Sequence, residues 1–270
     1  MSIVHAIVLG IVQGLTEFIP VSSSGHLQLV PWLFGWNDFA GAPHLEQTFD
    51  VALHLGTLVG AVAYFRRDLL RYAVAGLTQR STPDGRLAWL LLASSIPAAI
   101  TGALLEDTFA DLGNTEWVIG ALLIVFGLVL LVADRLGGHR TREDYGRRDA
   151  LLTGVAQALA LAPGVSRSGV TITTARWLGF DRDAAARLSF LMSLPIIGGA
   201  LLYKGADVVG DFPSGFAAAF VWGIVASGIT GWFAVWATLR IVRTHSFTPF
   251  VVYRLVAGTA VILIAASSWR

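Results

Sequence analysis

Long apolar blocks alternate with short charged segments along the chain. Clusters of Arg, Asp and Glu separate the blocks and are sparse inside them. A helix needs about 17 to 25 apolar residues to cross the hydrocarbon layer of a bilayer. Six blocks approach this length, and they cover residues 49–65, 88–104, 117–133, 188–203, 216–238 and 248–266. The pattern predicts six transmembrane helices.

Two further apolar stretches, residues 2–35 and 150–180, are broken near their middle by Pro, Gly and runs of hydroxyl side chains. Irregular backbone at membrane depth is tolerated only where protein or a wet cavity surrounds it. We therefore expect two re-entrant helical hairpins that meet at a functional site, in addition to the six spans.

The two interrupted stretches resemble each other. A shift of 144 residues lays residues 10–25 over residues 154–169 without a gap, and seven of the 16 positions are identical. The identical residues are Gly10, Gln13, Leu15, Val21, Ser22, Ser24 and Gly25, which recur as Gly154, Gln157, Leu159, Val165, Ser166, Ser168 and Gly169. The match predicts an internal repeat within a single membrane domain over 1–270, with a first unit over 1–133 and a second over 150–270.

The distribution of Arg orients the two units. Segments 66–87 and 239–247 are rich in Arg and should be cytoplasmic, whereas the acidic segments 105–116 and 204–214 should lie outside. Threading six spans between these loops places the first hairpin on the outer side, the second on the cytoplasmic side and both termini outside. The expected fold is thus an all-α polytopic membrane protein with an inverted-topology repeat, whose sites form where broken helices meet.

Composition supports a membrane protein and narrows the classes of partner. Hydrophobic residues make up 55% of the 270 residues and charged residues 14%, against roughly 25% charged in a soluble domain. The net charge of +1 gives no general attraction to nucleic acid. Because the chain has no Cys, it forms neither a disulfide nor a thiolate metal site.

The first interrupted stretch reads QGLTEFIPVSSSGH. Pro20 should end one half-helix, and Ser22 or Ser23 is a good N-cap for the next. A helix start presents unpaired N–H groups and a partial positive charge, which favour an anion such as phosphate. Gly25 would let the backbone approach that anion closely. His26, three residues after Ser23, would share a helix face with it. The alternative is that His26 is simply a polar residue whose hydrogen bonds are satisfied at the helix start.

Glu17 is the most informative residue of this stretch. Placing a lone carboxylate inside an apolar half-helix costs several kcal/mol of free energy, so such a group is usually paired with another or has a functional role. The alternative interpretation places Glu17 at the interface, in water. Gln13 lies one turn earlier and could orient Glu17 or help it hold a metal ion, since Mg²⁺ commonly binds through one carboxylate, waters and substrate phosphates.

The second interrupted stretch, LAPGVSRSGVT, carries one basic residue, Arg167, among hydroxyls. Its guanidinium offers a planar fork of donors that matches phosphate oxygens. An Arg that snorkels to the interface near a loop is the alternative. The hydroxyls and N–H groups of both stretches would complete a phosphate cradle, formed by Ser22, Ser24, Gly25, Ser166, Ser168, Gly169 and Thr171.

Together these residues suit phosphoryl transfer. Arg167 and two helix N-termini would hold and neutralise a phosphate, and Glu17 or His26 would move protons. The nucleophile stays open between Ser23, His26 and an activated water.

Both segments closely resemble the signature segments of the undecaprenyl-diphosphatase family, also called BacA or UppP. FDVALHLGTL, FRRDL and ARWLGFDRDAAARLSFLMSLPIIGGA resemble that family too, so the likeness covers essentially the whole chain. By position, the family's acidic motif falls on Gln13 and Glu17, its serine and histidine on Ser23 and His26, and its arginine segment on Ser166, Arg167, Ser168 and Thr171. Gln13 replaces a first Glu, which argues against a mechanism that needs two carboxylates there.

The resemblance implies a multi-pass enzyme of the bacterial inner membrane that hydrolyses undecaprenyl diphosphate to the monophosphate carrier lipid of cell-wall synthesis. It also implies bacitracin resistance, a divalent cation such as Mg²⁺ or Ca²⁺, access from the periplasmic face and a homodimer among membrane lipids. A transporter or flippase of a polyprenyl phosphate lipid remains the alternative, because inverted repeats are common in carriers. The type 2 phosphatidic acid phosphatases are excluded, because the chain has no Arg-Pro pair and Thr173 stands where their His would be.

Overall fold

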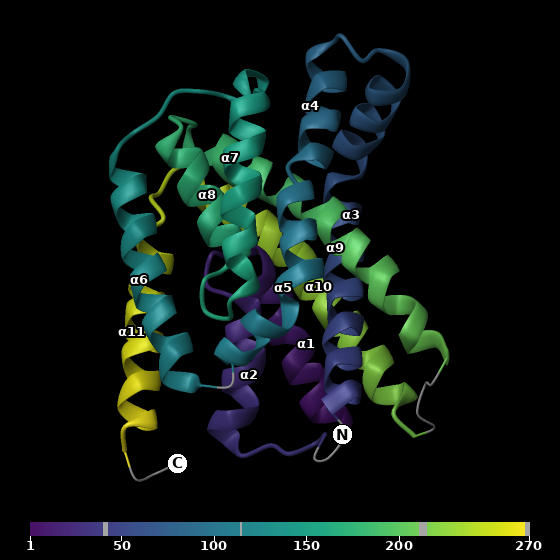
Figure 1. Cartoon of the computed structure of the whole chain (residues 1–270), viewed down its shortest axis with the longest axis vertical. Helices are drawn as coiled ribbons and strands as arrows, with labels where there is room; N and C mark the ends of the chain where they lie inside the picture. The colour runs from purple at the N-terminus through teal and green to yellow at the C-terminus, as the bar shows by residue number, and fades with distance from the viewer. Residues whose placement is uncertain (40–42, 114, 211–214, 268–270) are drawn as a thin grey trace.

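The computed structural model describes residues 1–39, 43–113, 115–210 and 215–267, and this part of the chain is built from helices (Figure 1). Two short 3-10 helices, η1 and η2, accompany the α-helices. The elements in chain order are α1 (Ile3–Phe18), α2 (Ser23–Phe34), α3 (Pro43–Thr78), α4 (Pro83–Ala93), α5 (Ile96–Gly113), α6 (Glu116–Arg135), η1 (Arg142–Asp144), α7 (Arg147–Ala158), η2 (Leu159–Leu161), α8 (Arg167–Trp177), α9 (Arg182–Gly210), α10 (Ala217–Val242) and α11 (Thr248–Ala265).

The six predicted spans are confirmed among the described residues. Helical segments long and apolar enough to cross a membrane are His44–Thr78, Pro83–Leu105, Glu116–Arg135, Arg182–Lys204, Ala217–Val242 and Thr248–Ala265. Each overlaps one predicted block. The first extends well beyond residue 65, because its polar end packs against α4, where the Trp89 indole N–H donates to the carbonyl of Gly76 at 3.0 Å. The second is broken at Ser94 and Ser95, between α4 and α5.

Two helix pairs, α1–α2 and α7–α8, enter the molecule from opposite ends (Figure 1). Their turns lie in the middle of the molecule, and the N-terminus and the end of α11 lie at the end from which α1–α2 enters. This arrangement has the shape expected of two opposed hairpins. Their re-entry into a membrane and the inverted repeat stay predictions, as does the sidedness of the loops. Residues 211–214 of the second predicted outer segment lie outside the described residues.

Close glycine contacts bring the long helices together. A Cβ on Gly10 or Gly14 of α1 would collide with backbone atoms of α10, and Gly120 of α6 has the same relation to Gly258 of α11. Without water to drive helix association in a bilayer, such close backbone approach is a main source of packing energy. The tightly packed long helices form the scaffold that holds the two turns.

Candidate active site

The two hairpin turns contact each other directly. Ser22 in the first turn accepts a hydrogen bond from the backbone N–H of Gly164 in the second, at 3.0 Å. In the opposite direction, the Ser168 hydroxyl of the second turn donates a hydrogen bond to the carbonyl of Ile19 in the first, at 3.1 Å. Two stretches that lie more than a hundred residues apart in the sequence therefore form one polar centre.

The turns share an unusual backbone conformation. Ser22 has φ 75° and ψ 95°, and Ser166 has φ 76° and ψ 113°. A positive φ outside glycine is uncommon and costs about 1 to 3 kcal/mol. Each serine is an N-cap whose hydroxyl accepts the N–H of a glycine three residues later, Gly25 or Gly169. The caps let α2 begin at Ser23 and α8 at Arg167, as the shift of 144 residues predicts.

Glu17 joins these two helix starts. Its Oε2 accepts the Ser23 hydroxyl at 2.5 Å and the Gln13 amide N–H at 2.9 Å. Its Oε1 accepts Nη2 of Arg167 at 2.6 Å. The Glu17 side chain is only 4% exposed. The carboxylate is thus paired rather than alone, and the ion pair with its hydrogen bonds offsets the cost of keeping its charge away from water.

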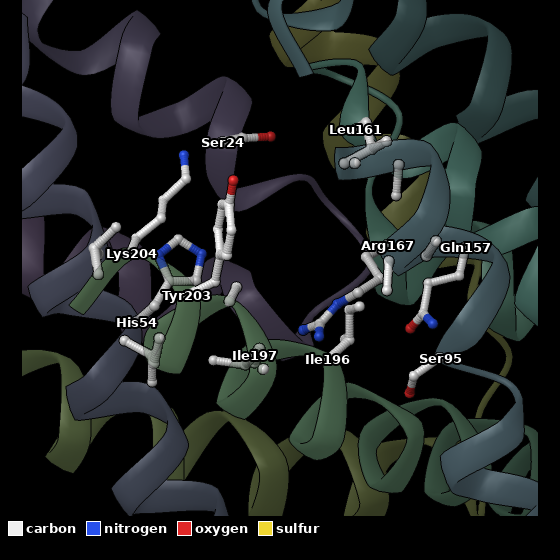
Figure 2. A pocket seen from close by; sticks show the side chains of 18 of the residues that line it. Ser24, His54, Ser95, Gln157, Leu161, Arg167, Ile196, Ile197, Tyr203 and Lys204 are labelled. Carbon is white, nitrogen blue, oxygen red and sulfur yellow. The ribbon is translucent and has the colours of Figure 1, made fainter. Parts of the chain in front are cut away.

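Arg167 reaches from the start of α8 into the pocket that Ser23 and Glu17 also line (Figure 2). Its Nη1 donates to the carbonyl of Ser193 on α9 at 3.2 Å. Because its side chain is 16% exposed, the guanidinium is held in place yet accessible from the pocket. A cation with several donors in this position can bind phosphate oxygens.

The pocket has a volume of about 700 Å³ and two kinds of wall. Polar groups gather where the hairpin turns meet. Much of the remaining wall is apolar or small and comes from α5, η2 and α9, including Ile96, Ala99, Ala103, Leu161, Ile197 and Leu201. A headgroup with charge and an aliphatic chain could therefore occupy it together.

His54 of α3 also lines this pocket, although the sequence analysis did not single it out. Its Nε2 lies 3.6 Å from Oε2 of Glu17. Figure 2 shows His54, Tyr203 and Lys204 on the side of the pocket opposite Arg167. An ionisable residue inside a predicted span was the available signal, because such residues are rare and mark functional sites.

His26 was expected beside Ser23, but the structure turns it away from the pocket. Its Nδ1 contacts the carbonyl of Ser22 at 2.7 Å, and its Nε2 contacts the Tyr253 hydroxyl of α11 at 2.6 Å. His26 is buried and is not part of the pocket wall. Both ring nitrogens are therefore engaged: Nδ1 within the first turn, and Nε2 in the contact between α2 and α11.

Some of the other residues expected to bind phosphate line the pocket, and others pack the helices around it. Ser22, Ser24 and Ser166 line the pocket. Thr171 instead connects α8 to α9, through a hydroxyl contact of 2.7 Å with Ser189. A Cβ on Gly25 would press on Ile119, so its small size serves the packing of the turn.

The predicted metal pair does not fit this arrangement. Gln13 is fully buried behind Glu17, donates its amide N–H to that carboxylate and takes no part in the pocket wall. Both oxygens of Glu17 already accept protein donors. No group of three or more His, Cys, Asp or Glu side chains could hold a metal ion among the described residues. Gln13 and Glu17 alone therefore do not complete a cation site among the described residues, and the divalent cation stays a prediction.

Arg254 of α11 is a second residue that the sequence analysis missed. It is 0% exposed, and its guanidinium donates at 2.9 to 3.3 Å to backbone carbonyls from α6 and from both hairpin turns. The acceptors are Pro20, Leu122, Leu123, Gly164 and Val165. Irregular turns leave carbonyls without helical partners, and Arg254 satisfies several of them at once.

Known proteins match this chain along nearly its full length. The family model described as bacitracin resistance protein BacA matches residues 6–260. A relative in Geobacter sulfurreducens named undecaprenyl-diphosphatase is 48% identical, with 97% of this chain and 98% of the relative covered. A relative of the same name in Desulforudis audaxviator is 49% identical, with 97% of each covered. One in Nocardioides is 42% identical, with 97% of this chain and 96% of the relative covered. The chain therefore belongs to the BacA family.

Proposed function

We propose that this protein is a membrane phosphatase that hydrolyses undecaprenyl diphosphate to undecaprenyl phosphate and inorganic phosphate. One observation carries the proposal. The Glu17 carboxylate joins the Ser23 hydroxyl to the Arg167 guanidinium, inside a pocket whose wall from α5 and α9 is largely apolar. The name of the relatives and the family's description as bacitracin resistance protein agree with this activity.

In the first step Ser23 attacks the terminal phosphorus. Glu17 accepts the hydroxyl proton, which it is placed to do at 2.5 Å. The bond between phosphorus and the bridging oxygen breaks, and the lipid monophosphate leaves with its electron pair. Arg167 neutralises charge on the transferring phosphoryl group, as preorganised cations do in phosphoryl transfer.

In the second step water attacks the phosphoserine and releases inorganic phosphate. The Ser23 oxygen leaves phosphorus and recovers its proton from Glu17. The apolar wall formed by α5 and α9 provides the surface on which the first isoprene units of the lipid would lie. The substrate thus orients its diphosphate toward the hairpin turns.

Phosphate release from a polyprenyl diphosphate tests the proposal. Wild-type protein purified in detergent should release inorganic phosphate, and Ser23→Ala should release it at least about 10³-fold more slowly, as expected for loss of a nucleophile. Ser23→Ala loses one hydrogen bond to the buried Glu17 carboxylate, so it should fold with a stability lowered by about 1.5 to 3 kcal/mol, and thermal unfolding checks this. A wild type that releases no phosphate but moves a polyprenyl phosphate lipid across vesicles would instead support a carrier.

We further propose an inner-membrane location with the pocket open to the periplasm. The Arg-rich segment 66–87 supports this orientation through the positive-inside rule. Single cysteines placed at Arg71 and Asp111 should react with an impermeant thiol reagent from opposite sides of the membrane. Labelling of both from one side would overturn the orientation. Divalent-cation dependence and a homodimer also stay proposals, to be tested by chelation during turnover and by mass in detergent.

A further inference from the structure

His54 faces the carboxylate that also binds Ser23 and Arg167. Its Nε2 lies 3.6 Å from Oε2 of Glu17, the same oxygen that accepts the Ser23 hydroxyl. Its side chain is 32% exposed and lines the pocket from α3 (Figure 2). The imidazole therefore lies beside the reacting hydroxyl and is accessible from the pocket.

The backbone of α3 fixes which ring nitrogen of His54 can accept a proton. Nδ1 lies 2.8 Å from the carbonyl oxygen of Asp50. A carbonyl only accepts hydrogen bonds, so Nδ1 carries the hydrogen and, in the neutral ring, Nε2 has the lone pair. The 3.6 Å to Glu17 is too long for a hydrogen bond. The basic nitrogen thus faces the pocket in a fixed orientation.

The two-step reaction needs a second base. The departing lipid monophosphate is a stable anion near neutral pH, since the second pKa of a phosphate monoester is about 6. It leaves without taking a proton, so Glu17 keeps the proton of Ser23 when the phosphoserine has formed. A protonated Glu17 is ready to act as the acid for Ser23 in the second step. It cannot also deprotonate the attacking water.

We propose that His54 is the general base for hydrolysis of the phosphoserine, an inference that rests on the proposed phosphatase function. Nε2 of His54 accepts one proton from the attacking water, whose oxygen forms the new bond to phosphorus. The bond from phosphorus to the Ser23 oxygen breaks, and that oxygen takes the proton of Glu17. Inorganic phosphate leaves, and His54 releases its proton to bulk water.

His26 cannot fill this role in the described arrangement. Its Nδ1 is engaged by the carbonyl of Ser22, and its Nε2 by the Tyr253 hydroxyl outside the pocket wall. Asp50 lines the pocket, but His54 is the group on α3 that lies beside Glu17. The two histidines therefore divide into a structural one on α2 and a catalytic one on α3.

Trapping the phosphoserine tests the assignment. Wild type, His54→Gln and the matched control His44→Gln, which changes an exposed position of the same helix, are mixed with a polyprenyl diphosphate labelled in its terminal phosphate. After acid quenching, protein-bound label and free phosphate are counted. His54→Gln should turn over about 10²- to 10⁴-fold more slowly, the usual contribution of a general base. It should accumulate labelled protein, whereas wild type and His44→Gln should not.

A second variant separates chemistry from folding. His54→Ala should regain part of its turnover when imidazole is added, and its labelled protein should then disappear. Slow turnover without labelled protein and without rescue by imidazole would overturn the assignment, as would normal turnover in His54→Gln. If wild type itself releases no phosphate, the proposed function fails rather than the role of His54. Loss of label in the double variant Ser23→Ala/His54→Gln identifies Ser23 as the labelled residue.

Discussion

The two hairpin turns have nearly the same backbone but different side chains. Each turn has a serine N-cap with φ near 75°, followed by the first residue of a helix that faces the pocket. That residue is Ser23 in the first hairpin and Arg167 in the second. Where the first hairpin has Glu17, the corresponding residue of the second is Leu161.

The comparison shows how one backbone design can carry two chemical tasks. In the proposed mechanism, the first hairpin provides the nucleophile with its base, and the second provides the cation that binds phosphate. Neither hairpin alone contains the complete set. Because Glu17 binds both helix starts, the site forms only when the two turns meet. The following variants test whether the two tasks are really separate.

Glu17→Gln should have the largest effect, because it removes the proposed base and leaves Arg167 without its carboxylate. Turnover should fall by about 10² to 10⁴-fold. Stability should fall as well, since breaking a buried ion pair from one side costs about 3 to 5 kcal/mol. Phosphate release and thermal unfolding are measured on the same preparation. Glu143→Gln, which removes an exposed pair with Arg142, is the matched control and should change neither value.

A Glu17→Gln protein that is more stable and fully active would contradict this interpretation. It would mean that the Glu17 carboxylate destabilises the folded protein at this depth and that the catalytic centre lies on other residues.

Arg167→Lys should have the next largest effect on turnover. An ammonium keeps the charge but cannot contact Glu17, the Ser193 carbonyl and a phosphate with the planar fork of a guanidinium. We expect a loss of about 10² to 10³-fold, similar to the loss of one preorganised donor. Steady-state phosphate release measures it, with Arg243→Lys at an exposed pair as the control. Near-normal turnover would reduce Arg167 to a general electrostatic role.

Replacing the two glutamines at corresponding positions, Gln13 and Gln157, should have different kinds of effect. Gln13 donates to the Glu17 carboxylate at 2.9 Å, whereas Gln157 donates to the backbone carbonyl of Ser94 at 3.3 Å. Gln13→Ala should slow turnover about tenfold, because a hydrogen bond to a charged group contributes about 1.5 to 3 kcal/mol. Gln157→Ala should mainly lower stability, by about 1 kcal/mol. Equal effects on turnover, measured side by side, would remove the distinction between the hairpins.

Replacing the two capping serines, Ser22 and Ser166, should give the smallest difference between the hairpins, and it should be a difference in stability. Glycine tolerates a positive φ and replaces an N-cap at a cost of only a few tenths of a kcal/mol. Ser166→Gly should therefore change stability little. Ser22→Gly should cost about 1 kcal/mol more, because the Ser22 hydroxyl also accepts the N–H of Gly164. Thermal unfolding of both variants measures this difference, and equal melting temperatures would show that the bond between the turns contributes nothing measurable.

The spans could be predicted from sequence because a long apolar block has few alternatives in a bilayer. Their ends could not, since a helix continues into polar sequence when another helix packs beside it. α3 runs past Arg66 and Arg67 for this reason, and α9 begins at Arg182 before its apolar block. Within the site, Glu17, Ser23 and Arg167 were predicted together from local motifs, and the structure brings them into contact.

Other site residues depend on distant partners that a local motif does not reveal. His26 shares a helical turn with Ser23, but Tyr253 of α11 draws its ring away from the pocket. His54 and Arg254 are isolated polar residues of long spans, and only tertiary contacts reveal what they touch. An ionisable residue inside a predicted span is therefore a candidate site residue even where no motif surrounds it.

The position of Arg254 has a consequence for how the protein is made. The carbonyls of both hairpin turns receive its N–H groups, yet Arg254 belongs to α11, the last helix of the described chain. During synthesis the hairpins leave the ribosome long before this helix does. Their turns must wait in the translocon or membrane with carbonyls unsatisfied, which is costly in lipid. The phosphatase centre is therefore completed only after α11 has inserted, and a chain that stops before α11 would carry no preformed site.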